Sequence, residues 1–156
     1  MTSSGLKSPD KLHSAAGRSE AEAALRDSFE SGWCAAAVIL VADRALAVSE
    51  QYGYLSGEDL LEQFFHFWNS ALQPGERLFR WSYSSFVAAP IQGDPAGIRR
   101  RFDKFASECI ACPLRGSAGR IPLLTGTRWR AYFLDATTPP EWICRAMDLF
   151  VANFAG

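Results

Sequence analysis

The stretch LFRWSYSSFVAAPI, residues 78–91, decides the fold of this sequence. Two segments rich in apolar residues, Leu78–Trp81 and Phe86–Ile91, flank the short polar run Ser82–Ser85. Two strand-like segments joined by a short polar turn are typical of a β-hairpin. The sequence therefore predicts an antiparallel pair of strands in the middle of the chain.

The residues before this hairpin predict a helix, a strand and a second helix. A Ser-x-x-Glu capping box at Ser19 opens the first helix. The continuous apolar run Ala35–Val41 suits a strand that is covered on both faces. After a turn region around Gly53 and Gly57, apolar residues recur at helical spacing over Glu58–Leu72, which predicts the second helix.

The residues after the hairpin predict two more helices with strands between them. Asp94 and Pro95 open a helix. Its apolar face is expected to carry Ile98, Phe102, Phe105 and Ile110. The segments Ile121–Leu124 and Arg128–Leu134 are expected to be strands, and a final helix begins near Pro140. This order of elements predicts an α+β fold with one sheet.

Composition and charge limit the function classes. The 156 residues are 48% hydrophobic, which suits a folded domain rather than a disordered chain. Sixteen Lys+Arg against 17 Asp+Glu give a net charge of −1, without the basic excess typical of nucleic-acid binding. The longest apolar run, Cys34–Ala42, is shorter than the roughly 20 residues of a membrane span. We therefore expect a cytoplasmic protein with no nucleic-acid or membrane partner, built as a flexible leader over residues 1–9 and one domain over residues 10–156.

The four cysteines leave two interpretations open. Cys109 and Cys112 form a Cys-x-x-Cys pair, but no second pair of cysteines or histidines completes a zinc set. Free cysteine is among the most buried residue types, so the four thiols are expected mostly to lie in the core. The alternative is a redox or metal role for Cys109 and Cys112.

The whole sequence resembles the GGDEF domains, the diguanylate cyclase family. Asp10, Leu12 and Arg18 match the pattern that opens these domains, and the closing pattern aligns with residues 145–156. In between, the residues in register are Tyr52, Gly53, Gly57, Leu60, Leu61, Arg80 and Trp81. Ser82-Tyr83-Ser84-Ser85-Phe86 stands in place of the Gly-Gly-Asp-Glu-Phe signature. The resemblance implies the nucleotidyl-cyclase palm, a ferredoxin-like core with a central, mostly antiparallel sheet flanked by helices.

The same resemblance implies that the chemistry of the family has been lost. Family cyclases join two GTP molecules into cyclic di-GMP with the help of a divalent metal held by carboxylates. The metal-binding positions of the family correspond to Val41, Ser84 and Ser85, and only Asp43 keeps a carboxylate nearby. We therefore expect no catalytic residues, no metal and no other cofactor, and we interpret the chain as a degenerate GGDEF domain that is not an enzyme.

The nucleotide-binding positions of the family are also altered. Its guanine-reading asparagine and aspartate correspond to Ser49 and Glu58, and Tyr83 at the hairpin tip is expected to crowd the phosphate space. Asn153 replaces a phosphate-facing lysine. The Arg-x-x-Asp motif of the family's inhibitory product site becomes Gln73-x-x-Glu76, which offers no arginine.

Two functions fit this pattern, and they lie in different classes. The first is a regulatory module of bacterial signalling that works through a protein partner or as a homodimer. The second is a sensor that still binds GTP or cyclic di-GMP weakly, through Asp43, Ser49 and Glu58. An enzyme of altered chemistry is disfavoured by the missing acids, and an unrelated α+β domain is the remaining alternative.

Three further groups of residues each have a structural and a functional interpretation. The acidic residues Asp43, Glu50, Glu58 and Asp59 are typical of solvated helix starts, or they mark a site. The run Arg99–Arg101 is either plain surface or a contact for a partner or a phosphate. The aromatic residues of the second helix are expected in the core, but they cover so much of its circumference that some could face a partner. That aromatic set is Phe64, Phe65, Phe67 and Trp68.

Overall fold

The computed structural model describes residues 11–31, 35–114, 122–135 and 137–154. A short 3₁₀ helix, η2 (Leu12–Ser14), precedes the main elements. The helices are α1 (Arg18–Ser31), α2 (Ala45–Tyr52), α3 (Tyr54–Ala71), α4 (Pro95–Ala106) and α5 (Pro140–Phe154). The strands are β1 (Ala35–Ala42), β2 (Arg77–Ser82), β3 (Ser85–Ile91), β4 (Ile110–Pro113), β5 (Pro122–Thr125) and β6 (Thr127–Leu134). The leader predicted for residues 1–9 lies outside the described residues.

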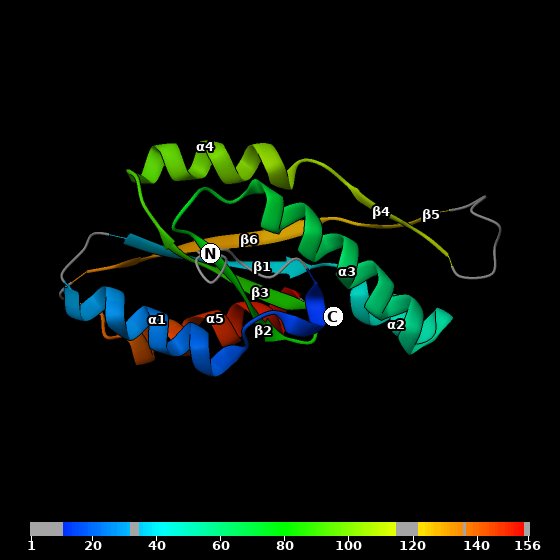
Figure 1. The fold of residues 1–156 in the computed structure, drawn as a ribbon, viewed down its shortest axis with the longest axis horizontal. Coiled ribbons are helices and arrows are strands. Elements are labelled where there is room, and N and C mark those ends of the chain that lie inside the picture. The colour runs from blue at the N-terminus through cyan, green and yellow to red at the C-terminus, as the bar shows by residue number, and fades with distance from the viewer. Residues whose placement is uncertain (1–10, 32–34, 115–121, 136, 155–156) are drawn as a thin grey trace, which may run out of the picture.

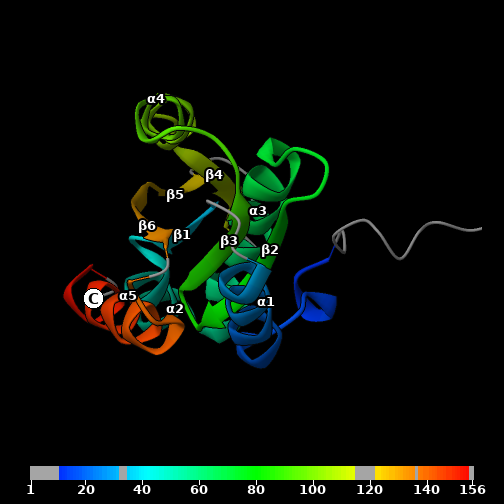
Figure 2. The ribbon, with the colours of Figure 1, turned by 90° about the vertical axis from the view of Figure 1, so that its left-hand side faces the viewer.

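A four-stranded sheet with the order β2-β3-β1-β6 forms the centre of the fold, and every pair in it is antiparallel. Helices α3 and α4 cover one face of this sheet and α1 and α5 cover the other, as Figures 1 and 2 show. This is the predicted α+β palm. The hairpin predicted within residues 78–91 consists of β2 and β3, with Tyr83 and Ser84 as its turn.

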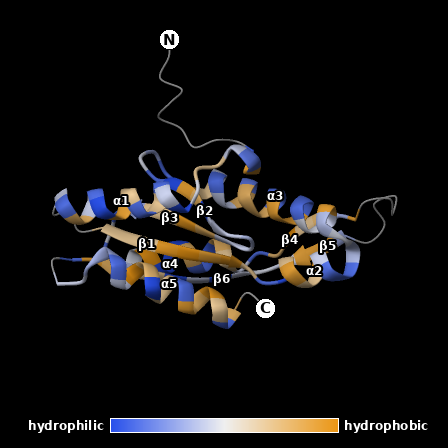
Figure 3. Cartoon of the chain, turned by 90° about the horizontal axis from the view of Figure 1, so that it is seen from below, coloured by the Kyte–Doolittle hydropathy of each residue, from blue (hydrophilic) through white to orange (hydrophobic). Residues whose placement is uncertain are grey.

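Strand β1 is buried along its whole length because it lies between the two helical layers. Its side chains alternate between two cores: Val38 and Leu40 face α3 and α4, whereas Ile39 and Val41 face α1 and α5. Figure 3 shows this strand coloured hydrophobic from end to end, between helices of mixed colour. The prediction of a strand covered on both faces is confirmed.

The aromatic residues of α3 lie mainly in the core, as the sequence predicts. Phe64, Phe65 and Trp68 are fully buried. Helix α4 supplies the cover that one sheet face cannot, because Phe102 stacks on Trp68 with ring centroids 5.6 Å apart. Phe67 is half-buried and contacts Phe105 of the same helix edge-on.

Three boundaries differ from the sequence expectation. Helix α2, which the sequence did not predict, comes directly before the predicted turn region, and α3 begins at Tyr54 rather than Glu58, so Gly57 is helical. The two helices are separated by Gly53, whose φ of 97° is a backbone conformation that glycine adopts without strain. Ile110 belongs to β4, not to the face of α4, and β4 pairs with β5 in a second, two-stranded sheet. The prediction of one sheet is therefore wrong.

One ion pair joins the first and last long helices across the lower layer of the fold. The guanidinium of Arg18 donates two hydrogen bonds to the carboxylate of Asp148, each 2.8 Å long. Trp81 donates to the same carboxylate over 3.0 Å, and the Arg18 guanidinium lies 4.0 Å from the centre of the Trp81 ring. These bonds raise the pKa of Arg18 above its ordinary value, so the arginine stays charged.

Among the described residues, no helix combines the length and the apolar character that crossing a bilayer requires.

Candidate functional site

The positions that correspond to the family's metal site meet where β1 ends. The backbone N–H of Ala42 donates to the carbonyl of Ser84 in the hairpin turn, over 2.9 Å. The next N–H, that of Asp43, donates to the carbonyl of Gly126 between β5 and β6, over 3.2 Å. The end of β1 is therefore held between the hairpin and the start of β6, so Asp43 and Ser84 lie in one region of the fold.

The carboxylate of Asp43 is used to hold this junction together. Its Oδ1 accepts a 2.8 Å hydrogen bond from the backbone N–H of Gly126 and a 3.2 Å bond from the hydroxyl of Thr125. Thr125 is buried and its hydroxyl oxygen also accepts the N–H of Arg44, over 3.3 Å. A Cβ at Gly126 would stand 3.0 Å from Asp43 Oδ2, so glycine permits this close approach. Asp43 thus has a structural role in this fold.

The other positions of the metal site present no carboxylate. Val41 is buried in the core beneath α1 and α5, and Ser84 and Ser85 are buried at the hairpin. The hydroxyls of Ser82 and Ser85 are hydrogen-bonded to each other. Within the described residues, no three histidine, cysteine or acidic side chains gather in a way that could hold a metal ion. Magnesium prefers several carboxylate oxygens, so these residues do not fit a divalent cation.

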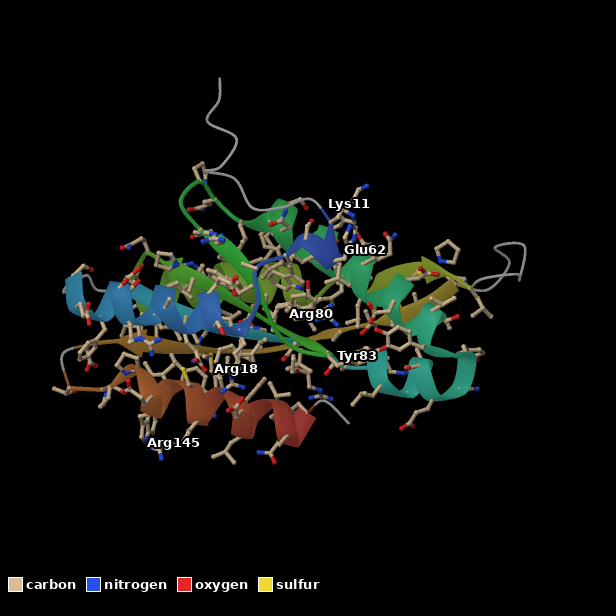
Figure 4. All side chains as sticks on the ribbon, turned by 60° about the horizontal axis from the view of Figure 1, so that its bottom comes forward. Lys11, Arg18, Glu62, Arg80, Tyr83 and Arg145 are labelled. Carbon is tan, nitrogen blue, oxygen red and sulfur yellow. The ribbon has the colours of Figure 1, made fainter. Side chains whose placement is uncertain are left out.

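Arg80 fixes the turn that carries Tyr83. Its Nε donates to the carbonyl of Ser82 over 2.9 Å, and its Nη2 donates to the carbonyl of Tyr83 over 2.6 Å. Figure 4 shows Arg80 and Tyr83 side by side at this end of the hairpin. The guanidinium also lies 3.8 Å from Glu58 Oε2. Both of these hydrogen bonds go to the turn, so Arg80 holds the hairpin tip in one conformation.

Tyr83 fills the space between α2 and α3. A Cβ at Gly57 would stand 2.5 Å from the Tyr83 hydroxyl and 2.9 Å from the Cβ of Ser49. The Tyr83 ring also lies 6.1 Å from the ring of Tyr54, between their centroids. From the sequence, Tyr83 is expected to crowd the phosphate space, whereas the structure turns its side chain toward Gly57 and Ser49, and the resemblance aligns Ser49 with a guanine-reading residue of the family.

Two buried polar atoms in this group accept or donate no hydrogen bond among the described residues. They are the hydroxyl of Tyr83 and Oε2 of Glu58. Buried polar atoms are normally satisfied, so each of these two atoms marks a spot where a water or a ligand group would be stabilised. The structure therefore brings Ser49, Glu58 and Tyr83 together, while Asp43 is bonded to the β5–β6 junction instead.

The remaining sequence candidates have structural environments. Phe86 is fully buried, and its ring lies 5.5 Å from that of Phe64. Asn153 is exposed near the end of α5. Glu76, which the resemblance aligns with the family's inhibitory motif, accepts a 2.8 Å hydrogen bond from Arg101 and a 2.9 Å bond from the N–H of Gln73. Arg101 thus has a structural partner in Glu76, whereas Arg99 and Arg100 are exposed.

The cysteines occupy three different environments. Cys109 is exposed, Cys112 is buried against Val48 and Leu60, and Cys144 is half-buried. Burial raises the pKa of the Cys144 thiol. The expectation that the cysteines mostly lie in the core holds for Cys112 but is wrong for Cys109, and Cys34 lies outside the described residues.

Sequence reasoning missed the partners that make Asp43 structural. Thr125 and Gly126 lie between two strand-like segments, and a glycine in such a position indicates a tight turn between the strands. It also missed the need for Gly57, because it treated this glycine as part of a turn. Gly57 lies inside α3, where Tyr83 and Ser49 approach too closely for a side chain.

Solved structures of GGDEF domains share this fold. The GGDEF domain of FimX from Pseudomonas aeruginosa matches with a TM-score of 0.75 and 14% identity, over 96% of this chain and 93% of that chain. The GGDEF domain of YfiN (TpbB) from Pseudomonas aeruginosa matches with a TM-score of 0.73 and 20% identity, over 90% of this chain and 91% of that chain. The diguanylate cyclase SiaD from Pseudomonas aeruginosa, solved with its activator SiaC, matches with a TM-score of 0.74 and 15% identity, over 88% of this chain and 54% of that chain. No family model and no curated protein matches the sequence.

Proposed function

We propose that this chain is a degenerate GGDEF-like module of a bacterial signalling system, which makes no cyclic di-GMP and acts through contact with a protein partner or a second copy. The observation that carries the proposal is that the carboxylate of Asp43 is already used to accept hydrogen bonds within the fold. This single remaining carboxylate accepts bonds from Gly126 and Thr125, and the other metal positions carry Val41, Ser84 and Ser85.

The chemistry of cyclase action explains why this loss matters. Attack of a hydroxyl on an α-phosphate depends on cations that neutralise the developing charge and align the reacting groups. Removal of one transition-state stabiliser typically costs roughly 10²–10³ in rate. A site without any free carboxylate for the cation is therefore expected to support no turnover.

The position of Tyr83 supports the same conclusion for substrate binding. Its hydroxyl lies against Gly57 and Ser49, where the resemblance places the base of the nucleotide. Arg80 holds the backbone of the turn that carries this tyrosine. For a guanine to enter, the Tyr83 side chain would have to leave a largely enclosed space, which costs free energy that the ligand must supply.

A contact role is supported by apolar side chains on the outer face of α5. Trp142 and Leu149 are 53% and 67% exposed, and they lie two helical turns apart. Arg145 lies between them on the same helix and points away from the body of the protein in Figure 4. SiaD, which has this fold, was solved together with an activator protein.

The decisive test is incubation of the purified protein with GTP and Mg²⁺, followed by detection of cyclic di-GMP by mass spectrometry. We expect none above a heat-denatured control. Formation of cyclic di-GMP would overturn the proposal. Light scattering over a range of protein concentrations then separates the two modes of contact, because a homodimer gives a concentration-dependent mass and a partner-dependent module does not.

A second candidate function, nucleotide sensing, is favoured by one observation. Glu58 Oε2 and the Tyr83 hydroxyl are buried without a hydrogen-bond partner among the described residues. A thermal shift assay with GTP or cyclic di-GMP and Mg²⁺ tests it, because a ligand that binds the native state raises the melting temperature. The matched control is Glu58→Gln, which removes the charge but keeps the shape, and a sensor that uses Glu58 would lose the shift in this variant.

A further inference from the structure

A groove of about 740 Å³ lies between α4 and β6, away from the site described above. One wall is the exposed side of α4, including Arg99 and Arg100. The other wall is β6, where Trp129, Ala131 and Phe133 line the groove. In Figure 1, α4 runs above β6, and Figure 2 shows α4 at the β6 side of the sheet.

Strand β6 is the last strand of the central sheet, so one of its edges is free among the described residues. The direction of its backbone groups follows from the register. The N–H of Ala42 donates to Ser84 on the β3 side. Because the backbone groups of successive residues in a strand point to opposite edges, the N–H and carbonyl of Val41 point toward β6. Its partner Arg128 is therefore bonded to β1, and so are the residues that alternate with it on β6.

The remaining residues of β6 direct their N–H and carbonyl groups away from β1. These are Thr127, Trp129, Ala131 and Phe133. Trp129 and Ala131 also belong to the α3–α4 side of the sheet, and Phe133 is 39% exposed. The free edge thus offers a row of backbone donors and acceptors beside an apolar floor, which is the surface that an extended peptide requires for strand addition.

Arginines surround this edge on both faces. Arg99 and Arg100 of α4 are exposed on the groove side. Arg128 and Arg130 of β6 are also exposed, with their guanidinium groups near the rings of Phe154 and Tyr132, and Arg130 contributes to the lining of the groove. Among the described residues that line the groove, Asp103 is the one acidic residue.

We propose that the free edge of β6 and the arginines of α4 bind an extended, acidic segment of a partner protein, which adds as a further strand to the sheet. This inference rests on the proposed contact function and adds to it a second surface, separate from the outer face of α5, with a partner class of its own. Opposite charges at cross-strand positions stabilise a strand pair, whereas like charges destabilise it. Edge pairing of a second copy would bring Arg128 and Arg130 toward the same residues of its neighbour, so the charge favours an acidic partner over self-association.

The test uses a short fluorescein-labelled peptide in which glutamate alternates with valine and threonine. Its binding to the full chain is measured by fluorescence anisotropy. The expected result is saturable binding that weakens at high ionic strength. A peptide with lysine in place of every glutamate serves as the charge control and is expected not to bind. Equal binding of both peptides, or of neither, would overturn the proposal.

Variants locate the binding surface. We expect Arg99→Glu with Arg100→Glu to weaken peptide binding about tenfold or more, since two favourable charge contacts become unfavourable. Arg26→Glu is the matched control, because it reverses an exposed arginine on α1, which does not line the groove. If Arg26→Glu weakens binding as much as the double variant does, the groove is not the site.

Amide hydrogen exchange distinguishes strand addition from general charge attraction. In the free protein, the amides of Trp129, Ala131 and Phe133 are expected to exchange rapidly, and those of Arg130 and Tyr132 slowly. Bound peptide is expected to slow exchange at the first three positions. Peptide binding without this protection, or tighter binding of a labelled single-stranded oligonucleotide than of the acidic peptide, would overturn the inference. Failure of these tests leaves the proposed lack of cyclase activity intact, because that is judged by cyclic di-GMP formation alone.

Discussion

The hydroxyl of Tyr83 lies so close to Gly57 that a methyl group on this glycine would stand 2.5 Å from it. Gly57 is inside α3, where alanine would ordinarily be the better residue. The close approach therefore explains why a glycine is tolerated in the helix. It also ties the hairpin turn to α3 through a side chain rather than through the backbone.

Gly57→Ala is expected to destabilise the protein. Alanine gains about 1 kcal/mol in an exposed helix, but overpacking at a filled position typically costs about 1–3 kcal/mol. Urea unfolding of Gly57→Ala, Tyr83→Ala and the double variant measures the balance. We expect a coupling energy of about 0.5 kcal/mol or more between the two positions. Additive effects would show that Tyr83 does not contact Gly57 in solution.

Restoring the lost acids is expected to damage the fold without restoring activity. Val41 is fully buried in the core of α1 and α5, and an unpaired carboxylate there is expected to cost about 3–5 kcal/mol. Val41→Thr, which keeps the shape, is the control and should be milder. The triple variant Val41→Asp, Ser84→Asp, Ser85→Glu is expected to yield no cyclic di-GMP from GTP and Mg²⁺, since Tyr83 still fills the space beside Gly57 and Ser49. Turnover by this variant would refute the expectation.

Asp43→Ala is expected to lower stability by about 1–3 kcal/mol, because the N–H of Gly126 loses its acceptor at a partly buried position. Asp43→Asn keeps an oxygen that can accept this bond and is expected to lose less. Denaturant midpoints of the two variants give the comparison. Equal stability of the alanine variant and the original protein would mean that the junction is held by its backbone bonds alone.

The thiols are expected to react with iodoacetamide in a fixed order. Cys109 is exposed and should be alkylated first, whereas Cys112 is buried. Burial raises the pKa of Cys144, so its reactive thiolate is scarce near neutral pH and becomes more abundant as the pH rises toward that pKa. Peptide mapping by mass spectrometry at two pH values measures the rates. Equal labelling of Cys109 and Cys144 at neutral pH would contradict this order.

Local patterns were sufficient to predict much of the fold. The hairpin of β2 and β3, the buried β1 and the start of α4 each follow from a hydrophobic pattern and its flanking turn residues. Helix α2 was missed because only Ala45 and Val48 of its residues are buried, so its apolar pattern is short. Strand β4 was missed because Ile110 continues the helical spacing of α4, although the helix ends at Ala106.

The candidate site was predictable in position but not in its contacts. The resemblance grouped Asp43, Ser84 and Ser85 in one site, and in the structure the hairpin residues Ser84 and Ser85 lie beside the end of β1, next to Asp43. It did not predict that Asp43 bonds to Gly126, because these residues are 83 positions apart and meet only in the folded chain. The same is true of Arg101, whose bond to Glu76 gives one residue of a basic run a structural role.

The ion pair between Arg18 and Asp148 spans 130 positions of the chain, and α5 also contributes Ile143 and Met147 to the core beneath β1. During synthesis, the side of the sheet that α1 covers therefore stays incomplete until the ribosome has released most of α5. A nascent chain that has emerged only through β6 would still show apolar surface there, and chaperones that recognise such surface would have their longest access at this stage.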